Sequence, residues 1–310
     1  MTSAAQIGLS SASLAGMALD QALACGRRLG FEAVEILGFE GERHSQGDLC
    51  GFEFAERAPA DLEALRGRLA GYRQISVHAP FILVPLLATN PGIRREAFRQ
   101  VAACVRGIAT AGGATCTVHL NGAPFWRPDE WRRAAVRVLG ELGAVGAECG
   151  VTVALETGCP ATEEEYCALL EEANHPWVGA CIDTGHIMHY YPQALKGTAE
   201  GVAQHNDILN RVVARLGARV VVFHVHDNRQ ADHRDHRAPG RGIIDWPRLL
   251  RTIRQTGLRA PLLLELEEPD FEAALLAGKQ CLLDALAGPD LAGTPQSRRE
   301  PRLRTSPKDP

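Results

Sequence analysis

The chain of 310 residues is poor in lysine, in aromatic residues and in long apolar runs, and each shortage excludes a class of protein. Lysine occurs only at Lys196, Lys279 and Lys308, so arginine carries most of the positive charge, and the formal net charge is −4. A chain of this charge lacks the generally basic surface of a protein that coats nucleic acid. No apolar stretch approaches the ~20 residues of a membrane span, so we expect no membrane attachment.

Common nucleotide and nucleophile motifs are also missing. The turn after the first strand-like run, GLSSASLAG, has no GxGxxG, and neither a P-loop nor GxSxG occurs, so we expect no nucleotide cofactor. The nine cysteines include no CxxC pair, and most lie in apolar segments, where a free thiol behaves as a small apolar side chain. No basic residue precedes ALAC at 22–25, which argues against a signal peptide. A reduced, cytoplasmic setting is expected.

Short apolar runs alternate with longer amphipathic segments along the chain. Several runs, such as VVVFHV, are almost wholly apolar, as in parallel strands covered on both faces. We expect strands at 6–10, 33–37, 74–78, 116–119, 151–156, 178–183, 220–226 and 261–267, and helices at 61–70, 94–111, 129–149, 162–173, 206–216, 247–256 and 271–287. This alternation predicts a single (β/α)8 TIM barrel over residues 1–287, with an open doubly wound sheet as the competing arrangement.

Two further segments do not fit the repeating pattern. The connection from His186 to Asn206 is longer than most loops between a strand and a helix, and we expect it to form a lid or a substrate wall. Residues 288–310 are rich in proline and arginine and poor in apolar residues, so we expect a disordered tail.

Polar side chains recur where the apolar runs end, and in a barrel these ends meet at the rim that carries the active site. An acid that closes an apolar strand is costly to bury unless it is paired or binds a metal. Mixed carboxylates and imidazoles suit Mn²⁺, Zn²⁺, Fe²⁺ or Co²⁺ better than Ca²⁺, so the pattern predicts a divalent metal site. The residues are Glu35, His78, His119, Glu156, Asp183, His186, His226, Asp227 and Glu265 or Glu267.

Two segments suggest local geometry. In CIDTGH, Gly185 would let the backbone turn so that Asp183 and His186 address one point. In HVHDN, His224 and His226 face the same side of a strand, about 7 Å apart. We expect His226, nearer the rim, to be the better ligand and His224 to support the site or pack in the core.

Seven segments together resemble the strand-end motifs of the xylose isomerase-like TIM-barrel superfamily. This superfamily includes sugar phosphate isomerases and epimerases, inosose dehydratases and endonuclease IV. The resemblance covers residues 6 to about 285, and the segments are ISVHAPF, TVHLNG, VALETG, CIDTGH, HVHDN, HRAPGRGIIDW and LLLELE.

The isomerase and epimerase pattern implies one divalent metal on Glu156, Asp183, His226 and Glu265. In those enzymes the two glutamates move a proton on and off a substrate carbon. His186 resembles a residue that contacts substrate or metal. The endonuclease-like pattern would add His78, His119 and His236 as ligands, but it has an aspartate where this chain has Arg234.

The expected function is that of a divalent-metal-dependent isomerase or epimerase of a sugar, sugar phosphate or related polyol. Glu156 and Glu265 would act as base and acid beside the metal. Two alternatives remain open on the same residues: an endonuclease IV-like phosphodiesterase, and a dehydratase or non-haem iron oxidative enzyme. Substrate contacts are expected from His186, Arg237, Glu35 and Trp126.

The expected partner is a small-molecule substrate rather than nucleic acid. A nucleic-acid enzyme needs basic loops with aromatic side chains, yet aromatic residues make up 5% of this chain. No basic cluster occurs at the predicted rim outside 229–241. Assembly into a homo-oligomer is left open.

Overall fold

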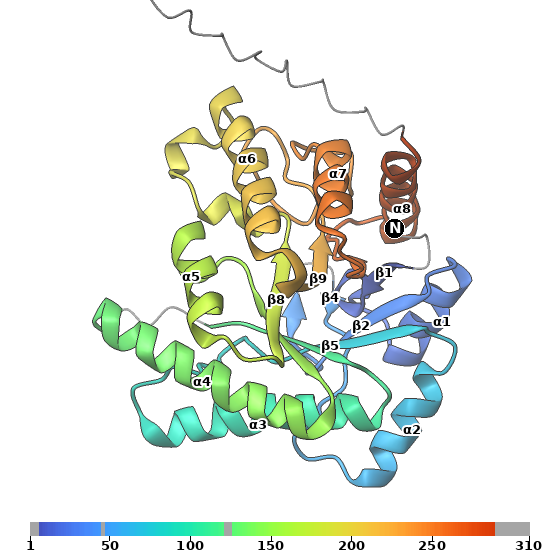
Figure 1. Ribbon diagram of the computed structural model, residues 1–310. Coiled ribbons are helices and arrows are strands. Elements are labelled where there is room, and N and C mark those ends of the chain that lie inside the picture. The colour runs from blue at the N-terminus through green and yellow to red at the C-terminus, as the bar shows by residue number, and fades with distance from the viewer. Residues whose placement is uncertain (1–5, 45–46, 121–125, 289–310) are drawn as a thin grey trace, which may run out of the picture.

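Eight parallel strands close into a barrel in the order β1-β10-β9-β8-β7-β6-β5-β2, which confirms the predicted TIM-barrel fold (Figure 1). The computed structural model describes residues 6–44, 47–120 and 126–288. The predicted tail begins at residue 288, and its residues 289–310 lie outside the described residues. The barrel strands are β1 (Ile7–Ser10), β2 (Ala33–Leu37), β5 (Gln74–His78), β6 (Thr115–Val118), β7 (Thr152–Glu156), β8 (Val178–Asp183), β9 (Val220–Val225) and β10 (Leu262–Leu264).

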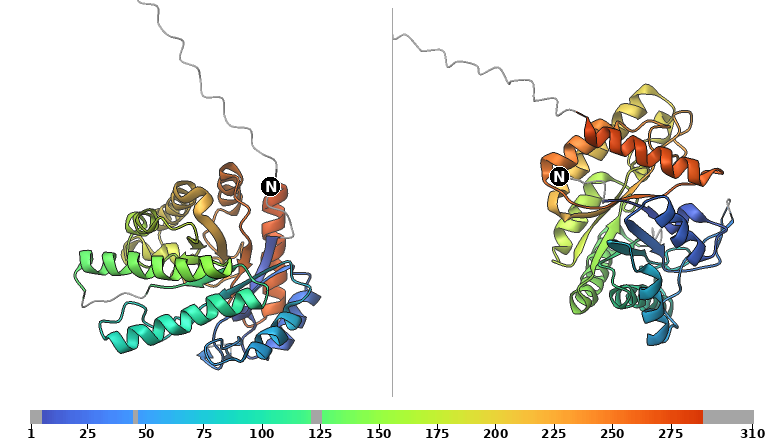
Figure 2. Two further views of the ribbon diagram at one scale, coloured as in Figure 1. Left: turned by 60° about the horizontal axis from the view of Figure 1, so that its bottom comes forward. Right: turned by 90° about the vertical axis from the view of Figure 1, so that its right-hand side faces the viewer.

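The α-helices lie outside the ring of strands, one after each (Figure 2). A short antiparallel pair, β3 (Arg43–His44) and β4 (Gly47–Asp48), precedes the second helix. None of the helices in the described ranges is both long and apolar enough to cross a membrane. The helices are α1 (Leu19–Arg28), α2 (Pro59–Leu69), α3 (Pro91–Thr110), α4 (Pro128–Cys149), α5 (Glu163–Ala173), α6 (Ala199–Leu216), α7 (Trp246–Thr256) and α8 (Phe271–Ala287).

Local capping explains where several helices begin. A proline occupies the first turn of α2, α3, α4 and α7, where its missing N–H leaves no intrahelical hydrogen bond unmade. The side chain of Thr162 accepts a hydrogen bond from the backbone N–H of Glu165 and caps α5. Thr198 caps α6 in the same way, through the N–H of Gly201.

The cap at Thr198 also corrects the predicted long connection. Helix α6 begins at Ala199 rather than near Asn206, so the loop after β8 is shorter than expected. It contains two 3-10 turns, His186–His189 and Gln193–Leu195. The last strand is also shorter than predicted, because the hydroxyl of Ser13 bonds the backbone of both Leu264 and Leu266 at the point where the chain leaves the sheet.

The interior of the barrel has two layers with different chemistry. A small apolar cluster fills one level, and it consists of Ala33, Ala154, Cys181, Val222 and Leu263. Side chains two residues apart on a strand point to the same face. The next inward level toward the C-terminal rim therefore consists of Glu35, Glu156, Asp183, His224 and Glu265. The fold thus places five ionisable groups directly above an apolar floor.

Candidate metal centre

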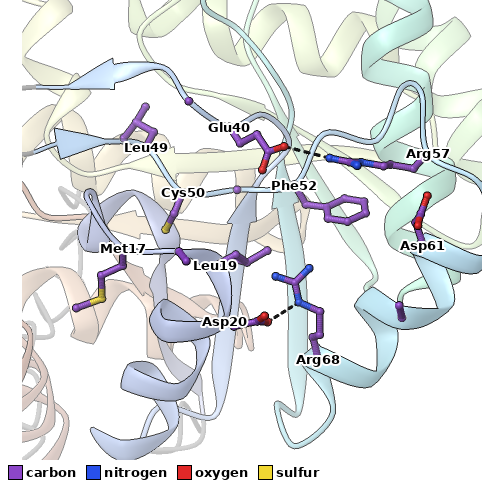
Figure 3. Close-up of a pocket in the computed structure, with 14 residues that line it drawn as sticks. Met17, Leu19, Asp20, Glu40, Leu49, Cys50, Phe52, Arg57, Asp61 and Arg68 are labelled. Atoms are coloured by element: carbon purple, nitrogen blue, oxygen red, sulfur yellow. Dashed lines mark hydrogen bonds and ion pairs between the residues drawn. The ribbon is translucent and has the colours of Figure 1, made fainter.

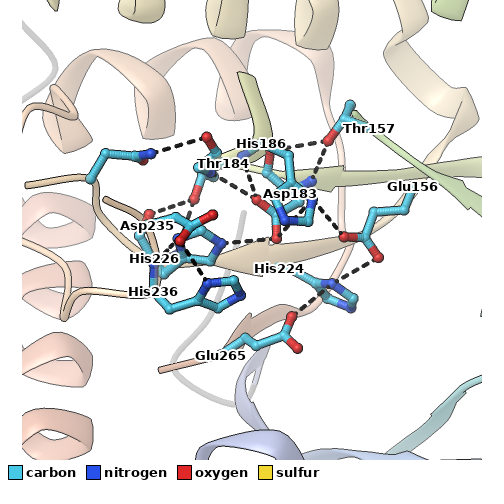
Figure 4. A network of polar contacts seen from close by, with 12 residues as sticks. Glu156, Thr157, Asp183, Thr184, His186, His224, His226, Asp235, His236 and Glu265 are labelled. Carbon is cyan, nitrogen blue, oxygen red and sulfur yellow. Dashed lines mark hydrogen bonds and ion pairs between the residues drawn. The ribbon is translucent and has the colours of Figure 1, made fainter. Parts of the chain in front are cut away.

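His224 lies between the two glutamates that the sequence singled out (Figure 4). Its Nδ1 atom is 3.3 Å from Oε2 of Glu156 and 3.1 Å from Oε2 of Glu265. All three side chains are buried or nearly so, and Asp183 has a carboxylate oxygen within 4.8 Å of the ligand atoms of His224 and Glu265.

These contacts leave hydrogen-bonding capacity unused. Neither Nδ1 of His224 nor Oε2 of Glu156 has a hydrogen-bond partner with acceptable geometry among the described residues. Buried polar atoms without partners are rare, and each needs an explanation. Atoms bound to one ion at about 2.0–2.2 Å lie roughly 3 to 3.5 Å from one another, which matches this spacing. His224 shares one group of possible ligands with Asp183 and Glu265, and its Nδ1 atom also contacts Glu156, so these four residues are candidate ligands of a divalent ion, which we call the central ion.

Glu35 supports His224 from below. Its Oε1 atom is 2.8 Å from Nε2 of His224, and its Oε2 atom accepts a hydrogen bond from the hydroxyl of Thr117 at 2.9 Å. Neither Oε1 of Glu35 nor Nε2 of His224 has a hydrogen-bond partner of acceptable geometry among the described residues, so the contact between them is electrostatic. A carboxylate beside Nε2 favours a proton on that nitrogen, which would make Nδ1 the metal-binding atom. Glu35 was predicted to contact substrate, but the structure places it fully buried beneath His224.

His226 faces Asp183 rather than the glutamates. Its Nδ1 atom accepts a hydrogen bond from the backbone N–H of His236 at 2.9 Å, so its proton lies on Nε2. Nε2 donates that proton to Oδ2 of Asp183, also at 2.9 Å. Both ring nitrogens are engaged by these hydrogen bonds, so His226 would have to release the proton on Nε2 before that nitrogen could bind a metal.

Asp183 is held from both sides. Its Oδ1 atom accepts hydrogen bonds from the backbone N–H groups of Gly185 and His186, at 2.9 and 2.7 Å. The φ of Gly185 is −86°, which any residue can adopt, so the predicted conformational role of this glycine is wrong. The constraint is steric, because a Cβ atom at Gly185 would overlap the ring of His226.

A second group of possible ligands adjoins the first and shares Glu156. The Nε2 atoms of His78 and His119 are 3.2 Å apart, and they lie 3.2 and 3.0 Å from Oε2 of Glu156. Nδ1 of His78 donates to the carbonyl oxygen of Ala79 at 2.9 Å, so in the neutral ring Nε2 carries the lone pair that a metal would bind. His78, His119 and Glu156 could therefore hold a second ion.

His186 and His236 complete the ring of imidazoles. Nδ1 of His186 is 3.0 Å from Oε1 of Glu156, and the ring of His236 stacks on His226 with centroids 4.2 Å apart. Asp183, His186, His226 and His236 have possible ligand atoms within 4.8 Å of one another. A third ion here would require His226 to give up its proton and its hydrogen bond to Asp183, so this group fits a metal less well.

The carboxylates of the centre are held in their charged form. Burial raises the pKa of Glu156, but the positive charges of His119 and His224 outweigh it and hold the pKa well below its usual range. Burial acts in the same direction on Glu265, yet His224 lowers its pKa to about 2.

The imidazoles shift in the opposite sense. Burial lowers the pKa of His224, but its acidic neighbours, including Glu35 and Glu156, raise it well above its usual value. For His186, the charge of Asp183 and the hydrogen bond to Glu156 outweigh burial and raise the pKa to about 10. In the metal-free centre, protons on imidazoles thus balance carboxylates, and a bound dication would replace those protons.

A cavity of about 200 Å³ opens above the centre. No lysine or arginine is among the described residues that line it. Its polar lining residues are His78, His119, Glu156, His186, His236, Glu265 and Glu267, and its apolar lining residues include Leu37, Phe39, Leu49, Phe81, Ile82 and Leu266.

Two of the predicted substrate contacts lie away from this cavity. The guanidinium of Arg237 is 3.4 Å from Glu268 and donates to the backbone oxygen of Asp235. Trp126 donates its indole N–H to the carbonyl of Leu87 and lines a separate cavity between α3 and α4, of about 600 Å³.

Another hollow, of about 580 Å³, lies beside α1 and α2 (Figure 3). Its charged side chains largely pair with one another: Arg57 contacts Glu40 at 3.0 Å, and Arg68 contacts Asp20 at 2.5 Å. None of the predicted metal ligands or catalytic residues lines this hollow, so it is not the candidate active site.

The sequence spacing along the strands also indicates that His224 lies at the level of the acids. Glu35, Glu156 and Asp183 each follow a small inward residue by two positions. His224 follows Val222 by the same two positions, whereas His226 follows it by four. This offset places His224 at the level of the acids and His226 one level nearer the rim.

Solved structures with the same architecture include sugar epimerases. A D-tagatose 3-epimerase-like protein aligns with TM-score 0.68 and 19% identity, covering 91% of this chain and 97% of that one. An L-ribulose 3-epimerase aligns with TM-score 0.70 and 14% identity, covering 91% and 95%. The IOLI protein with a bound zinc atom aligns with TM-score 0.66 and 17% identity, covering 91% and 98%. At these identities the likeness extends to the fold.

Similar sequences occur in bacteria. An uncharacterized protein of Sinorhizobium fredii is 31% identical over 122 residues, which cover 38% of this chain and 34% of that protein. An uncharacterized protein of Mycobacterium tuberculosis is 24% identical over 294 residues, covering 88% of this chain and 93% of that protein. The family described as xylose isomerase-like TIM barrel matches residues 23–285. As its motifs predicted, the chain belongs to the xylose isomerase-like TIM barrel family.

Proposed function

We propose that the chain is a divalent-metal-dependent isomerase or epimerase of a small sugar or polyol. The observation that carries the proposal is the placement of Glu156 and Glu265 on either side of Nδ1 of His224, at the floor of the cavity. A bound divalent ion would polarise neighbouring hydroxyl and carbonyl oxygens of the substrate and so acidify the C–H bond between them. The sugar epimerases that share the fold support this chemistry.

Two glutamates suffice for the proton transfers. Their low pKa values keep Glu156 and Glu265 ionised, so either can accept a proton from carbon. For inversion, the other glutamate takes up a proton from solvent and delivers it to the opposite face of that carbon, while the first glutamate releases its proton to solvent. For isomerisation, the glutamate that took the proton gives it to the adjacent carbon, and the hydroxyl proton moves to the former carbonyl oxygen. Nδ1 of His186, 3.0 Å from Oε1 of Glu156, is placed to stabilise that carboxylate or to share its proton.

The ion assignment follows from the same contacts. We propose that the central ion binds Glu156, Asp183, Glu265 and His224, with His224 in place of the His226 favoured by the sequence. The unpartnered Nδ1 of His224 supports this choice, as do the two hydrogen bonds that engage His226. Mn²⁺, Zn²⁺, Fe²⁺ and Co²⁺ all accept such a mixed set of ligands.

The cavity favours an uncharged substrate. About 200 Å³ is small for an extended ligand, and no cationic side chain among the lining residues is available for a phosphate. Arg237, a predicted substrate contact, lies 3.4 Å from the carboxylate of Glu268 instead. We therefore propose that the substrate is an unphosphorylated sugar or polyol, whose less polar face would be directed toward Phe39 and Phe81.

Deuterium exchange tests the proposal directly. Metal-free protein is loaded with each of the four metals and incubated in D₂O with unphosphorylated ketoses, aldoses and inososes. We expect deuterium at a carbon beside the carbonyl group, read by NMR, and loss of exchange in Glu156→Gln and Glu265→Gln. Glu32→Gln, just before β2 and outside the cavity lining, is the control and should retain exchange. A metal-loaded protein that exchanges none of these substrates would contradict the proposal.

The group formed by His78, His119 and Glu156 favours a second candidate function. Two ions bridged by one carboxylate would suit phosphodiester hydrolysis, dehydration or iron-dependent oxidation. Metal analysis of the purified protein separates one ion per chain from two. Nicking of a duplex with an abasic site, or hydrolysis of bis(p-nitrophenyl) phosphate, would favour the hydrolytic alternative.

A further inference from the structure

Three buried side chains outside the proposed ligand set form a continuous chain of hydrogen bonds. Oη of Tyr191 lies 3.1 Å from Nδ1 of His205 and 2.6 Å from Nδ1 of His233. Nε2 of His205 lies 2.9 Å from the carbonyl oxygen of Thr184. Tyr191 is 7% exposed, and His205 and His233 are 0% exposed. The three residues come from the loop after β8, from helix α6 and from the loop after β9.

One arrangement of protons satisfies these contacts when both imidazoles are neutral. The carbonyl oxygen of Thr184 can only accept, so Nε2 of His205 carries a proton and its Nδ1 must accept from the hydroxyl of Tyr191. The oxygen of Tyr191 then accepts from Nδ1 of His233. Burial lowers the pKa of His205 to about 3 and also lowers that of His233, which keeps both rings neutral.

The chain of hydrogen bonds ends on a peptide group that touches Asp183. The carbonyl of Thr184 and the N–H of Gly185 belong to one planar peptide unit, which rotates as a body. His205 binds the oxygen of this unit, and Asp183 accepts from its N–H at 2.9 Å. A rotation that frees the oxygen from His205 would therefore also turn the N–H away from Asp183.

The other end of the chain holds the loop after β9. His233 has φ of 56°, a left-handed conformation that is uncommon outside glycine. Its N–H donates to the carbonyl of Arg229 at 2.7 Å, and its carbonyl accepts from Nδ2 of Asn228 at 3.0 Å. Asn228 also donates to the carbonyl of Gly185, at 3.1 Å. The same loop carries His236, whose N–H engages His226.

We propose that Tyr191, His205 and His233 are positioning residues, which fix the Thr184–Gly185 peptide and the 228–236 loop and thereby set the direction of the Asp183 carboxylate. The inference rests on the proposed function only because that proposal makes Asp183 a metal ligand. Groups that orient the ligands of a metal commonly change its affinity about 10- to 100-fold. The network should therefore affect metal binding as well as the stability of the fold.

Tyr191→Phe removes one hydroxyl and leaves both histidines without their partner. The matched control is Tyr72→Phe, because Tyr72 is also 7% exposed and its hydroxyl donates to the carbonyl of Leu23 at 2.7 Å. Tyr72 precedes β5 and so lies toward the opposite end of the barrel. Tyr191→Phe loses two buried hydrogen bonds and Tyr72→Phe loses one, so both variants should be destabilised.

Metal binding to the metal-free protein separates the two roles. We expect Tyr191→Phe to weaken Zn²⁺ binding about 10- to 100-fold in a chelator competition, and Tyr72→Phe to leave it unchanged. With Co²⁺ bound, the visible absorption bands should shift in Tyr191→Phe only. His205→Gln, whose amide can still donate to Thr184, should bind Zn²⁺ more tightly than His205→Ala.

The outcomes distinguish this inference from the proposed function. Equal metal affinity in the native protein and Tyr191→Phe, with unchanged Co²⁺ spectra, overturns the positioning role and leaves the proposed chemistry intact. A native protein that binds none of the metals overturns both. A weakened metal affinity in Tyr191→Phe supports the inference even when no substrate is turned over.

Discussion

Nε2 of His224 lies 2.8 Å from Oε1 of Glu35, inside the barrel and below the cavity. Because a charged oxygen faces one ring nitrogen and holds a proton there, the other nitrogen, which is directed toward Glu156 and Glu265, is the one that would give up its proton to bind a metal. We therefore expect Glu35→Gln to weaken metal binding about 10- to 100-fold while the fold is retained. Glu32→Gln, at the other end of β2, is the control, and isothermal titration with Zn²⁺ is the measurement. Unchanged affinity in Glu35→Gln would remove Glu35 from this role.

The two histidines of HVHDN should respond differently to substitution. His224→Asn removes a proposed ligand of the central ion, so we expect the affinity of the protein for the metal to fall at least 100-fold. His226→Asn removes an orienting hydrogen bond to Asp183, so we expect a loss of about tenfold with the metal retained. Metal analysis after dialysis distinguishes them. A metal lost from His226→Asn and kept by His224→Asn would reverse the assignment.

The stability of the metal-free protein should fall as the pH rises from neutral. His186 has its pKa raised to about 10, and that of His224 is also raised. A group with a raised folded pKa contributes stability fully below its unfolded value of about 6.5, and this contribution is lost as the pH rises through the folded pKa. We expect urea midpoints to decline between about pH 6.5 and 10, less steeply in His186→Asn.

Added metal should reverse that trend. A dication replaces protons on the imidazoles, so its affinity rises over the same pH range. At a free concentration 100 times its dissociation constant, an ion stabilises the fold by about 2.7 kcal/mol. We therefore expect Zn²⁺ to raise the urea midpoint more at pH 8.5 than at pH 6.5. A stabilisation that shrinks with pH would contradict the assigned ligands.

Two glycine substitutions should have opposite effects on stability. A methyl group at Gly185 would overlap the ring of His226, so Gly185→Ala should destabilise the fold by about 1–3 kcal/mol and weaken metal binding. Gly140 lies inside α4 with no atom within 4 Å of a built Cβ. Gly140→Ala should therefore stabilise by about 0.5–1 kcal/mol through its helix propensity. Thermal unfolding of both variants checks the pair.

The barrel could be predicted from the sequence because its strands are short, apolar and regularly spaced. Strands β2, β5 and β8 have the predicted bounds. The last two end at the polar residues His78 and Asp183, and β2 ends at Leu37, just before Gly38. The start of α6 could not be placed, because the capping hydroxyl of Thr198 lies in a polar segment that resembles a loop. The length of β10 depends on Ser13, which comes from the other end of the chain.

The candidate site shows the same division. The residue types and the rim could be predicted from where polar residues follow apolar runs. The proposed roles of His224 and His226 could not, because they depend on contacts with Glu35 of β2 and with the His236 backbone. Tyr191, His205 and His233 were also missed, since they lie on three separate segments and meet only in the folded chain.

The apolar level formed by Ala33, Ala154, Cys181, Val222 and Leu263 closes the barrel below the candidate metal centre. Ions, water and substrate would then have to share one route, through the 200 Å³ cavity on the other side. Loading should be ordered, with the metal entering first and the substrate second. A bound substrate would in turn trap the ion beneath it, so a chelator should strip the metal more slowly whenever the cavity is filled.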